Sequence, residues 1–357
     1  MMDGEENNKL IEDIIKKIVA EPMEAENYLQ LGKLYVLNDD YERALGIYQS
    51  LLNVDPINVQ ALINSGSIYF YKLEFEKAIN NYSRAAEIET DNFSIYFNLG
   101  NAYAEMRNTK QAMLNYIKSM NLQPNNPAIY SAMGLLHQDQ NDFVEAKLYY
   151  EKAIKLDEKE PESYMNLACV LMKLYKFTEA TQAFQKALAL SPNDAKIALC
   201  CANALSSDDK YIEAGEYFEK AIELDPTYYQ AYVCYAISLC DQGKHERAIE
   251  YYNKAMEVDS ELPNAYILLA NLYVSESRYV DAINLYQSVE QLKLSDPNVL
   301  TLMGNTYVMM NNLESALEYY KKAVDKDFDN DETKLVYLEI ADEYISKKFE
   351  KGETSVV

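Results

Sequence analysis

The chain has 357 residues, of which 33 are basic and 57 acidic, giving a formal net charge of −24. It has no basic stripe of the kind that single-stranded nucleic acids or anionic membranes require, so neither is an expected partner. No apolar run approaches the roughly 20 residues that span a bilayer, and the start lacks a basic region followed by an apolar one. We therefore expect a soluble protein of the cytoplasm, with no membrane insertion.

Residues 1–24 are predicted to form a polar start and an N-terminal capping helix. From Lys9 to Glu21, six aliphatic residues recur at helical spacing: Leu10, Ile11, Ile14, Ile15, Ile18 and Val19. Pro22 stands where the closing proline of a preceding 34-residue unit would stand. The helix either caps that pattern or, because six aliphatics exceed what a cap requires, forms an edge for homo-oligomerisation.

From Ala25 to Asn330 the sequence repeats one pattern nine times without a gap, with a period of 34 residues. The predicted units are 25–58, 59–92, 93–126, 127–160, 161–194, 195–228, 229–262, 263–296 and 297–330. Such length would ordinarily suggest two or three domains. A stack of repeats in which each contacts its neighbours instead predicts one elongated domain.

Two positions of the second half of each unit are almost invariant. The first is alanine in every unit: Ala44, Ala78, Ala112, Ala146, Ala180, Ala214, Ala248, Ala282 and Ala316. Four residues later stands an aromatic: Tyr48, Tyr82, Tyr116, Tyr150, Phe184, Phe218, Tyr252, Tyr286 and Tyr320. This spacing places a small residue and a ring on one helix face, as expected where helices approach closely.

The first half of each unit has its own small position, filled by Gly or Ala: Gly32, Gly66, Gly100, Gly134, Ala168, Ala202, Ala236, Ala270 and Gly304. Because Gly within a helix costs about 1 kcal/mol relative to Ala, its recurrence predicts a very close contact. Each unit is therefore predicted to be two antiparallel helices joined at a short turn, such as Asn38–Asp40. Closing prolines such as Pro56 and Pro192 should end the second helix. The sixth unit, with Ala198 in the bulky opening place, should be the least tightly packed.

These residues resemble the tetratricopeptide-repeat family over 306 of the 357 residues. The resemblance implies an all-α fold, a right-handed α-α superhelix of nine helix pairs whose first helices line a concave groove. Residues 331–357 would add a C-terminal capping helix and a short tail, because Tyr337, Ile340, Ala341 and Tyr344 repeat the first-helix spacing.

The sequence offers little for catalysis, so we expect no enzyme, no cofactor and no metal site. The five cysteines (Cys169, Cys200, Cys201, Cys234 and Cys240) lack metal-ligand spacing and are expected to be free thiols in a reducing compartment. His137 stands at a repeat position that other units fill with tyrosine, which favours a histidine packed in the core. Neither a nucleophile–base signature nor a phosphate-binding loop is present.

The groove is the candidate binding site, because first-helix residues not used for packing form a stripe with few charges. Its apolar members include Ile63, Phe70, Tyr71 and Phe97. Asparagine recurs in two columns, one with Asn64, Asn98 and Asn166, the other with Asn101, Asn203, Asn271 and Asn305. A carboxamide can bond a peptide's N–H and C=O together. The arrangement is similar to the asparagine ladders by which some members of the family hold extended peptides, although other residues interrupt it here.

We therefore expect a non-enzymatic scaffold or adaptor that binds an extended, largely uncharged segment of a protein partner in its groove. Two alternatives remain open. One is a constitutive subunit of a large assembly, similar to a cell-cycle ubiquitin ligase or a ciliary-transport complex. The other is a targeting subunit for a separate enzyme.

Overall fold

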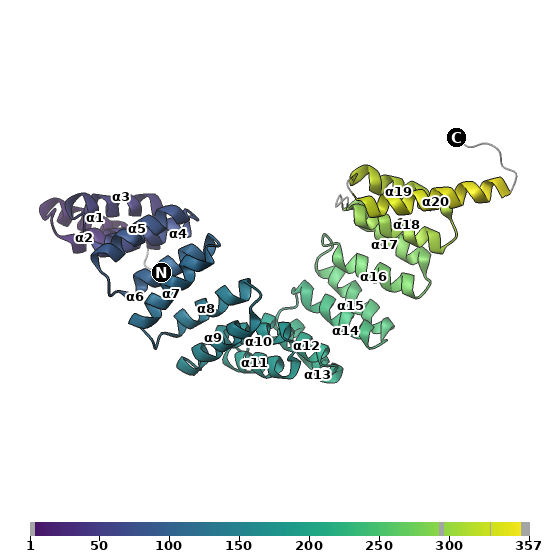
Figure 1. Cartoon of the computed structure of the whole chain (residues 1–357), viewed down its shortest axis with the longest axis horizontal. Helices are drawn as coiled ribbons and strands as arrows, with labels where there is room; N and C mark the ends of the chain where they lie inside the picture. The colour runs from purple at the N-terminus through teal and green to yellow at the C-terminus, as the bar shows by residue number, and fades with distance from the viewer. Residues whose placement is uncertain (1–3, 293–295, 329, 351–357) are drawn as a thin grey trace. The chain divides into compact units, whose positions relative to one another are not determined.

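The computed structural model describes residues 4–292, 296–328 and 330–350. These residues form twenty α-helices and contain no β-strand (Figure 1). By its internal contacts the chain divides into two compact units, Met1–Leu190 and Ser191–Val357. The all-α superhelical repeat fold predicted from the sequence is confirmed. The tail expected after the last helix falls among residues 351–357, which lie outside the described residues.

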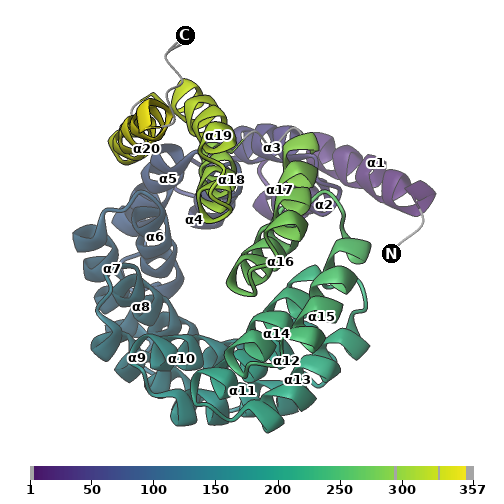
Figure 2. The same cartoon turned by 90° about the vertical axis from the view of Figure 1, so that its right-hand side faces the viewer.

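The first unit contains eleven helices in the described residues, and α1 begins at Gly4, before the aliphatic pattern starts. Their bounds are α1 Gly4–Ala20, α2 Ala25–Leu37, α3 Tyr41–Val54, α4 Val59–Tyr71, α5 Phe75–Ile88, α6 Phe93–Glu105, α7 Thr109–Leu122, α8 Pro127–Asp139, α9 Phe143–Leu156, α10 Pro161–Lys173 and α11 Phe177–Leu190. Within this unit, Figure 2 shows first helices such as α6 and α8 on the inner side and second helices such as α7 and α9 on the outer side.

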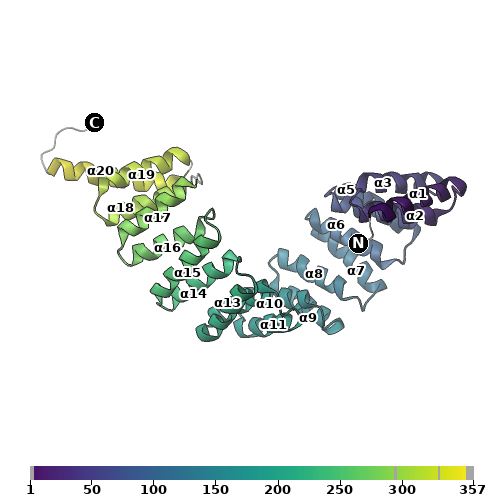
Figure 3. The ribbon, with the colours of Figure 1, turned by 180° about the vertical axis from the view of Figure 1, so that it is seen from behind.

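The second unit continues the same alternation of first and second helices (Figure 3). Its helices are α12 Ala195–Ser207, α13 Tyr211–Leu224, α14 Tyr229–Asp241, α15 His245–Val258, α16 Asn264–Ser275, α17 Tyr279–Gln291, α18 Pro297–Met309, α19 Leu313–Lys326 and α20 Asp331–Glu350. The last helix packs against α19.

Local signals fix where the helices begin and end. Asp40 and Asn58 cap α3 and α4, each accepting a backbone N–H with its side chain. Helices α3 and α11 end two residues before Pro56 and Pro192, as predicted. The turn between the helices of each repeat contains one residue with positive φ, at Asp39, Leu73, Arg107, Asn141, Tyr175, Asp209, Gly243, Ser277 and Asn311.

In the core of each repeat, an aromatic ring of the second helix packs against the small residue of the first helix. A methyl group added to Gly66 would lie 2.6 Å from the Tyr82 ring, closer than real carbon atoms approach. The glycines at the equivalent places in repeats 1, 3, 4 and 9 also face the ring of their own repeat. Repeats 5 to 8 carry a fully buried alanine there (Ala168, Ala202, Ala236 and Ala270), so their helix pairs accommodate the methyl group.

Tyrosine hydroxyls join successive repeats. Tyr130 Oη donates to the carbonyl of Pro124 over 2.8 Å, and Tyr232 Oη donates to that of Pro226 over 3.1 Å. In each case the ring belongs to a first helix and the carbonyl closes the preceding repeat. Tyr96 makes the same bond to Thr90, which replaces the closing proline. The bond thus requires a carbonyl at this place but no proline.

The expectation that the sixth repeat is the least tightly packed was wrong. Seven of the thirteen residues of α12 are buried, including Ile197, Ala198 and Cys201. Small side chains leave no cavity where the neighbouring helices lie close together. Protein interiors are generally densely packed in this way. Repetition of small residues in this repeat therefore indicates close approach.

We predict that Gly66→Ala and Gly46→Ala have opposite effects on stability. Alanine gains about 1 kcal/mol over glycine in a helix, and Gly46 on α3 has open space around it. At Gly66 the new methyl group overlaps the Tyr82 ring, and overpacking costs about 1–3 kcal/mol. Urea denaturation followed by circular dichroism should rank Gly66→Ala below Gly46→Ala by about that amount. Equal midpoints would contradict the proposed contact.

We also predict that stability falls at alkaline pH because of the buried tyrosines. Burial raises the pKa of Tyr82 and Tyr320 above the ordinary value and raises the pKa of Tyr286 to about 12. Below about pH 9 these phenols are protonated in both states and contribute no pH dependence. Above about pH 10 the unfolded chain loses their protons while the folded chain keeps them, so unfolding becomes more favourable.

The urea midpoint should therefore stay level up to about pH 9 and decrease above about pH 10. Tyr286→Phe is the matched control, since repeats 5 and 6 already carry Phe184 and Phe218 in this place. The variant should show a shallower decrease than the wild type. A midpoint that does not change with alkaline pH would disprove the assigned role of burial.

Candidate functional site

The predicted groove residues lie on first helices in both units. In the first unit, α4 carries Ile63, Asn64, Phe70 and Tyr71, α6 carries Phe97, Asn98 and Asn101, and α10 carries Asn166. In the second unit, α12, α16 and α18 carry Asn203, Asn271 and Asn305 respectively. The term inner surface is used below for the first-helix columns that contain these residues.

One cavity of this surface is lined by residues of α2, α3 and α4. It has a volume of about 780 Å³ and its lining includes Leu29, Lys33, Val36, Asn64 and Tyr71. Its walls combine aliphatic and aromatic carbon with a few polar groups, which is the usual composition of a ligand pocket. Of the predicted site residues in the first unit, this cavity brings together Asn64 and Tyr71 only.

The other apolar site residues are partly used for packing. Ile63 and Phe70 lie half-buried against the core that α2–α6 share, and Phe70 contacts the Phe75 ring edge-on. Phe97 is half-buried, with its ring centroid 6.0 Å from that of Tyr116. Tyr71, in contrast, is 67% exposed and lies 4.9 Å from the ring of Tyr41. Tyr71 is thus the most accessible of these four side chains.

The cavity also contains residues that the sequence analysis did not select. Tyr41 begins a second helix and still lines the cavity. Its hydroxyl donates to the Asp39 carboxylate over 2.9 Å, and this hydrogen bond raises the pKa of Tyr41 to about 12. Lys33 makes no ion pair with any described residue, which leaves one free cation at the cavity wall. The sequence analysis did not select Tyr41, because it begins a second helix and stands outside the first-helix columns.

The asparagines of one column form hydrogen bonds with tyrosines of the core. Asn101, Asn271 and Asn305 each accept, through Oδ1, the hydroxyl of the second-helix tyrosine of their own repeat, over 2.8, 2.5 and 2.5 Å. The partners are Tyr116, Tyr286 and Tyr320, whose rings are buried. A buried hydroxyl without a partner is costly, so the carboxamide oxygen satisfies the tyrosine. The two N–H groups of each amide remain for a ligand.

Asn203 differs because its repeat carries Phe218 in place of that tyrosine. It lies within hydrogen-bonding reach of the Cys234 thiol instead. Burial raises the pKa of Cys234, and hydrogen bonds from Gln230 and Asn203 oppose this rise. A thiol with a raised pKa is a poor nucleophile at neutral pH.

The other asparagine column differs from repeat to repeat. Asn64 accepts from Gln60 Nε2 over 2.8 Å and also hydrogen-bonds the buried Tyr48 hydroxyl. Asn98 and Asn166 are half-buried, and neither side chain hydrogen-bonds another described residue. Both carboxamides can therefore offer an N–H and an oxygen to the same ligand.

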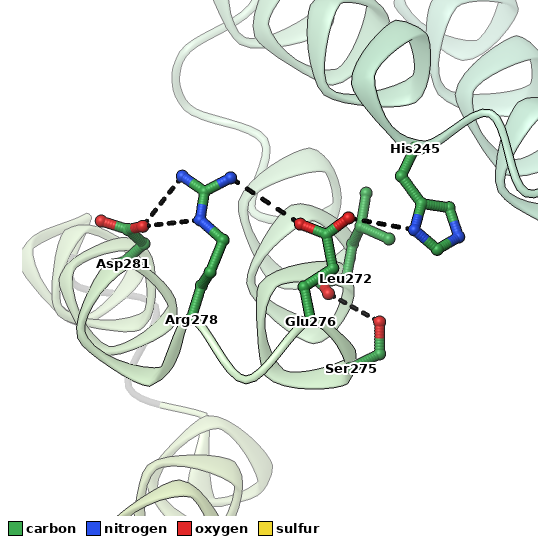
Figure 4. A network of polar contacts seen from close by, with 6 residues as sticks. All are labelled: His245, Leu272, Ser275, Glu276, Arg278 and Asp281. Atoms are coloured by element: carbon green, nitrogen blue, oxygen red, sulfur yellow. Dashed lines mark hydrogen bonds and ion pairs between the residues drawn. The ribbon is translucent and has the colours of Figure 1, made fainter.

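The two histidines belong to structural contacts. His137 stacks on Tyr149 with a centroid distance of 5.3 Å, and its Nδ1 lies 3.2 Å from Asp142. His245, at the start of α15, lies 3.0 Å from Glu276 at the end of α16 (Figure 4). Glu276 also faces Arg278, which pairs with Asp281 over 2.9 Å. The network connects repeats 7 and 8.

The described residues also bear on two other kinds of site. No group of three or more His, Cys, Asp or Glu in this part of the chain could hold a metal ion. Among the helices described, none combines the length and the apolar character needed to cross a membrane.

Several solved structures are similar to this chain. They include YrrB, described as a TPR protein with an unusual peptide-binding site, at 23% identity and a TM-score of 0.46, covering 52% of this chain and 95% of that one. PilF of Pseudomonas aeruginosa has 20% identity, a TM-score of 0.50 and coverages of 57% and 92%. PilW, described as a type IV pilus biogenesis factor, has 22% identity, a TM-score of 0.48 and coverages of 59% and 98%. At these identities the likeness shows the fold alone.

Family models cover almost the whole repeat array, whereas no curated protein matches the chain. Residues 227–295 and 297–330 match models described as tetratricopeptide repeat. Residues 9–232 match the model described as cilia and flagella-associated protein 70 C-terminal domain. The chain therefore belongs to the tetratricopeptide-repeat proteins, in the family named after the C-terminal domain of cilia and flagella-associated protein 70.

Proposed function

We propose that this protein is a non-enzymatic interaction scaffold that holds an extended segment of a protein partner on its inner surface. Tetratricopeptide repeats are interaction modules for proteins and peptides, and the proposal adds the site and the form of the ligand. The observation that carries it is the pair of unengaged carboxamides, Asn98 and Asn166, in the same column as Asn64 of the 780 Å³ cavity. An extended backbone needs such paired donors and acceptors at intervals along its length.

The two asparagine columns would have different roles. Asn98 and Asn166 would bond both the N–H and the C=O of the ligand. Asn64, whose amide already contacts Gln60 and Tyr48, would keep one N–H for the ligand. Asn101, Asn271 and Asn305 would donate to ligand carbonyls only, because tyrosine hydroxyls occupy their oxygens. The exposed ring of Tyr71 and the aliphatic wall of the cavity would take an apolar side chain. Each neutral hydrogen bond contributes about 0.5–1.5 kcal/mol net.

We also place the protein in the cytoplasm, on the support of its cysteines. All five are free in the structure. Thiols persist in reducing compartments, whereas oxidising compartments favour disulfides.

We predict that Asn64→Ala together with Asn98→Ala weakens partner binding and leaves the fold intact. Loss of two hydrogen bonds, about 1–3 kcal/mol in total, corresponds to about 5- to 150-fold in affinity. Affinity capture from native lysate, read by mass spectrometry, should lose partners that the wild type retains. The matched control is Asn80→Ala with Asn284→Ala, two exposed asparagines of second helices. An identical partner list for both variants would refute the inner surface as the site.

A second candidate function is a constitutive subunit of a ciliary or flagellar assembly. The name of the matched family favours it, and so does the outer face of α1. Ile14 is buried and caps the array, but Ile15 is 41% and Val19 78% exposed. These two residues, and not Ile14, could serve as an edge for self-association.

For this second candidate, Ile15→Glu with Val19→Glu should abolish any dimer without changing the thermal midpoint. Sedimentation velocity over a range of protein concentrations measures the dimer. Ile14→Glu is the control for loss of the cap, because placing a charge in the core is strongly destabilising. A wild type that stays monomeric at all concentrations would exclude self-association through α1.

A further inference from the structure

One outward column of the second helices is polar or glycine in seven repeats and leucine in repeats 3 and 4. Leu114 of α7 and Leu148 of α9 stand in one outward column, and both are about half exposed, at 48% and 52%. The same column elsewhere holds Gly46, Asn80, Gln182, Glu216, Glu250, Asn284 and Glu318. The repeat fold thus accepts polar residues here, so packing within the array does not explain the leucines.

Further exposed apolar residues extend the leucines along both helices. Ile117 follows Leu114 by three residues, and Val144 precedes Leu148 by four, so each pair shares a helix face. Helices α7 and α9 belong to neighbouring repeats and both pack against α8. Single exposed apolar residues are common, but two such pairs on second helices that share α8 as a neighbour point to an interaction surface. The outer patch is defined here as Leu114, Ile117, Val144 and Leu148.

The charge of the patch is opposite to that of the chain. Helix α7 carries Lys110 and Lys118 and no acidic residue, and α9 carries three lysines and two glutamates. These are the only second helices of the nine repeats with more basic than acidic residues, in a chain of net charge −24. Lys110 and Lys155 pair with no described residue, and Lys118 lies over the Tyr96 ring at 5.1 Å. Lys147 pairs with Glu151 over 3.2 Å and Lys152 lies over the Tyr130 ring at 5.8 Å, so two of the five ammonium groups have no partner among the described residues.

A pocket adjoins the patch and supplies a place for an anchoring side chain. It has a volume of about 380 Å³ and lies between α5, α6 and α7. Leu114 and Lys118 line it together with Tyr96, Leu99 and Tyr103. Glu87 of α5 also lines the pocket and would repel acidic groups of a ligand. Such groups are therefore favoured only on the α7 side of the pocket. A large apolar residue would fit among the tyrosines while a neighbouring carboxylate meets Lys118.

We propose that α7 and α9 form a second docking surface, which binds an acidic amphipathic segment of a protein partner. Opposite charge would guide the segment to these two helices of an otherwise acidic body, and the apolar patch would bury its hydrophobic face. The glutamates of α9 and the scarcity of arginine disfavour nucleic acid. The surface is separate from the inner surface proposed above, so a partner can occupy both.

The test compares two variants with the same change of charge. Leu114→Glu with Lys118→Glu alters the patch, and Gln182→Glu with Lys186→Glu alters the same two columns in repeat 5. Random displayed peptides of about four helical turns are selected on the wild-type chain and counter-selected on the Leu114/Lys118 variant. We expect the wild-type-specific peptides to be acidic, with apolar residues three or four apart.

For these peptides, fluorescence anisotropy should show at least about tenfold weaker binding to the Leu114/Lys118 variant. The repeat 5 variant should bind like the wild type. Raising NaCl from about 0.1 M to about 0.5 M should also weaken binding, because salt screens exposed charges. Peptides held by the inner surface would bind both variants equally, which separates this test from that of the proposed groove.

Four outcomes would overturn the proposal. The first is that no wild-type-specific peptide emerges, and the second is that those found are neutral or basic. The third is binding of the wild type, but not the Leu114/Lys118 variant, to vesicles of phosphatidylcholine and phosphatidylserine, which would assign the patch to membranes. The fourth is a wild-type dimer in sedimentation velocity that the variant lacks, which would assign the patch to a second copy. Circular dichroism midpoints confirm that each variant folds.

Discussion

The contact between an aromatic ring of the second helix and the small residue facing it determines most of this structure. The rings of Tyr48, Tyr150 and Tyr320 are almost completely buried, and their size sets how closely the two helices of a repeat approach. Where the small residue is Gly66 or Gly134, the ring occupies the place of a side chain. Helix pairing in this family is thus a matter of matched volumes, and the invariant alanine four residues before the ring completes the match.

The same ring connects the core to the inner surface. A buried tyrosine brings a hydroxyl into the core, and that hydroxyl needs an acceptor. Where the first helix offers a polar residue in the right column, the hydroxyl reaches it: Ser67 for Tyr82, and Asn305 for Tyr320. Where that column is apolar, the hydroxyl reaches further along the helix, as Tyr150 does to Gln138. Part of the asparagine pattern on the inner surface is therefore explained by the needs of the core.

The sequence predicted the fold well because the period of 34 residues repeats the same packing columns nine times. Helix ends followed from prolines and capping residues. The residue with positive φ in each turn was predictable only in part. Asp39, Asn141 and Gly243 are of types that adopt this conformation readily, whereas Leu73 and Tyr175 are not. The dense sixth repeat was also missed, because a sequence shows the size of Ala198 but not the distance to its neighbours.

The candidate site was harder to predict than the fold. Column position identified residues of the inner surface, but it did not separate Asn98, which has no partner among the described residues, from Asn101, whose oxygen is engaged. The difference depends on whether a tyrosine hydroxyl is within reach, which is a three-dimensional property. Similarly, Phe97 and Tyr71 are both aromatic residues of first helices, yet the first is half-buried and the second exposed.

A repeat protein provides its own reference for separating structure from function. In buried columns every repeat solves the same packing problem, so a departure is answered nearby, as Phe218 releases Asn203 to Cys234. In outward columns nothing inside the fold demands a particular residue, so packing does not explain why Leu114 and Leu148 stand where the other repeats have a polar residue or glycine. Leucine at this position occurs in two neighbouring repeats whose second helices also carry a net positive charge. Folding does not require this combination, and binding of a partner explains it better.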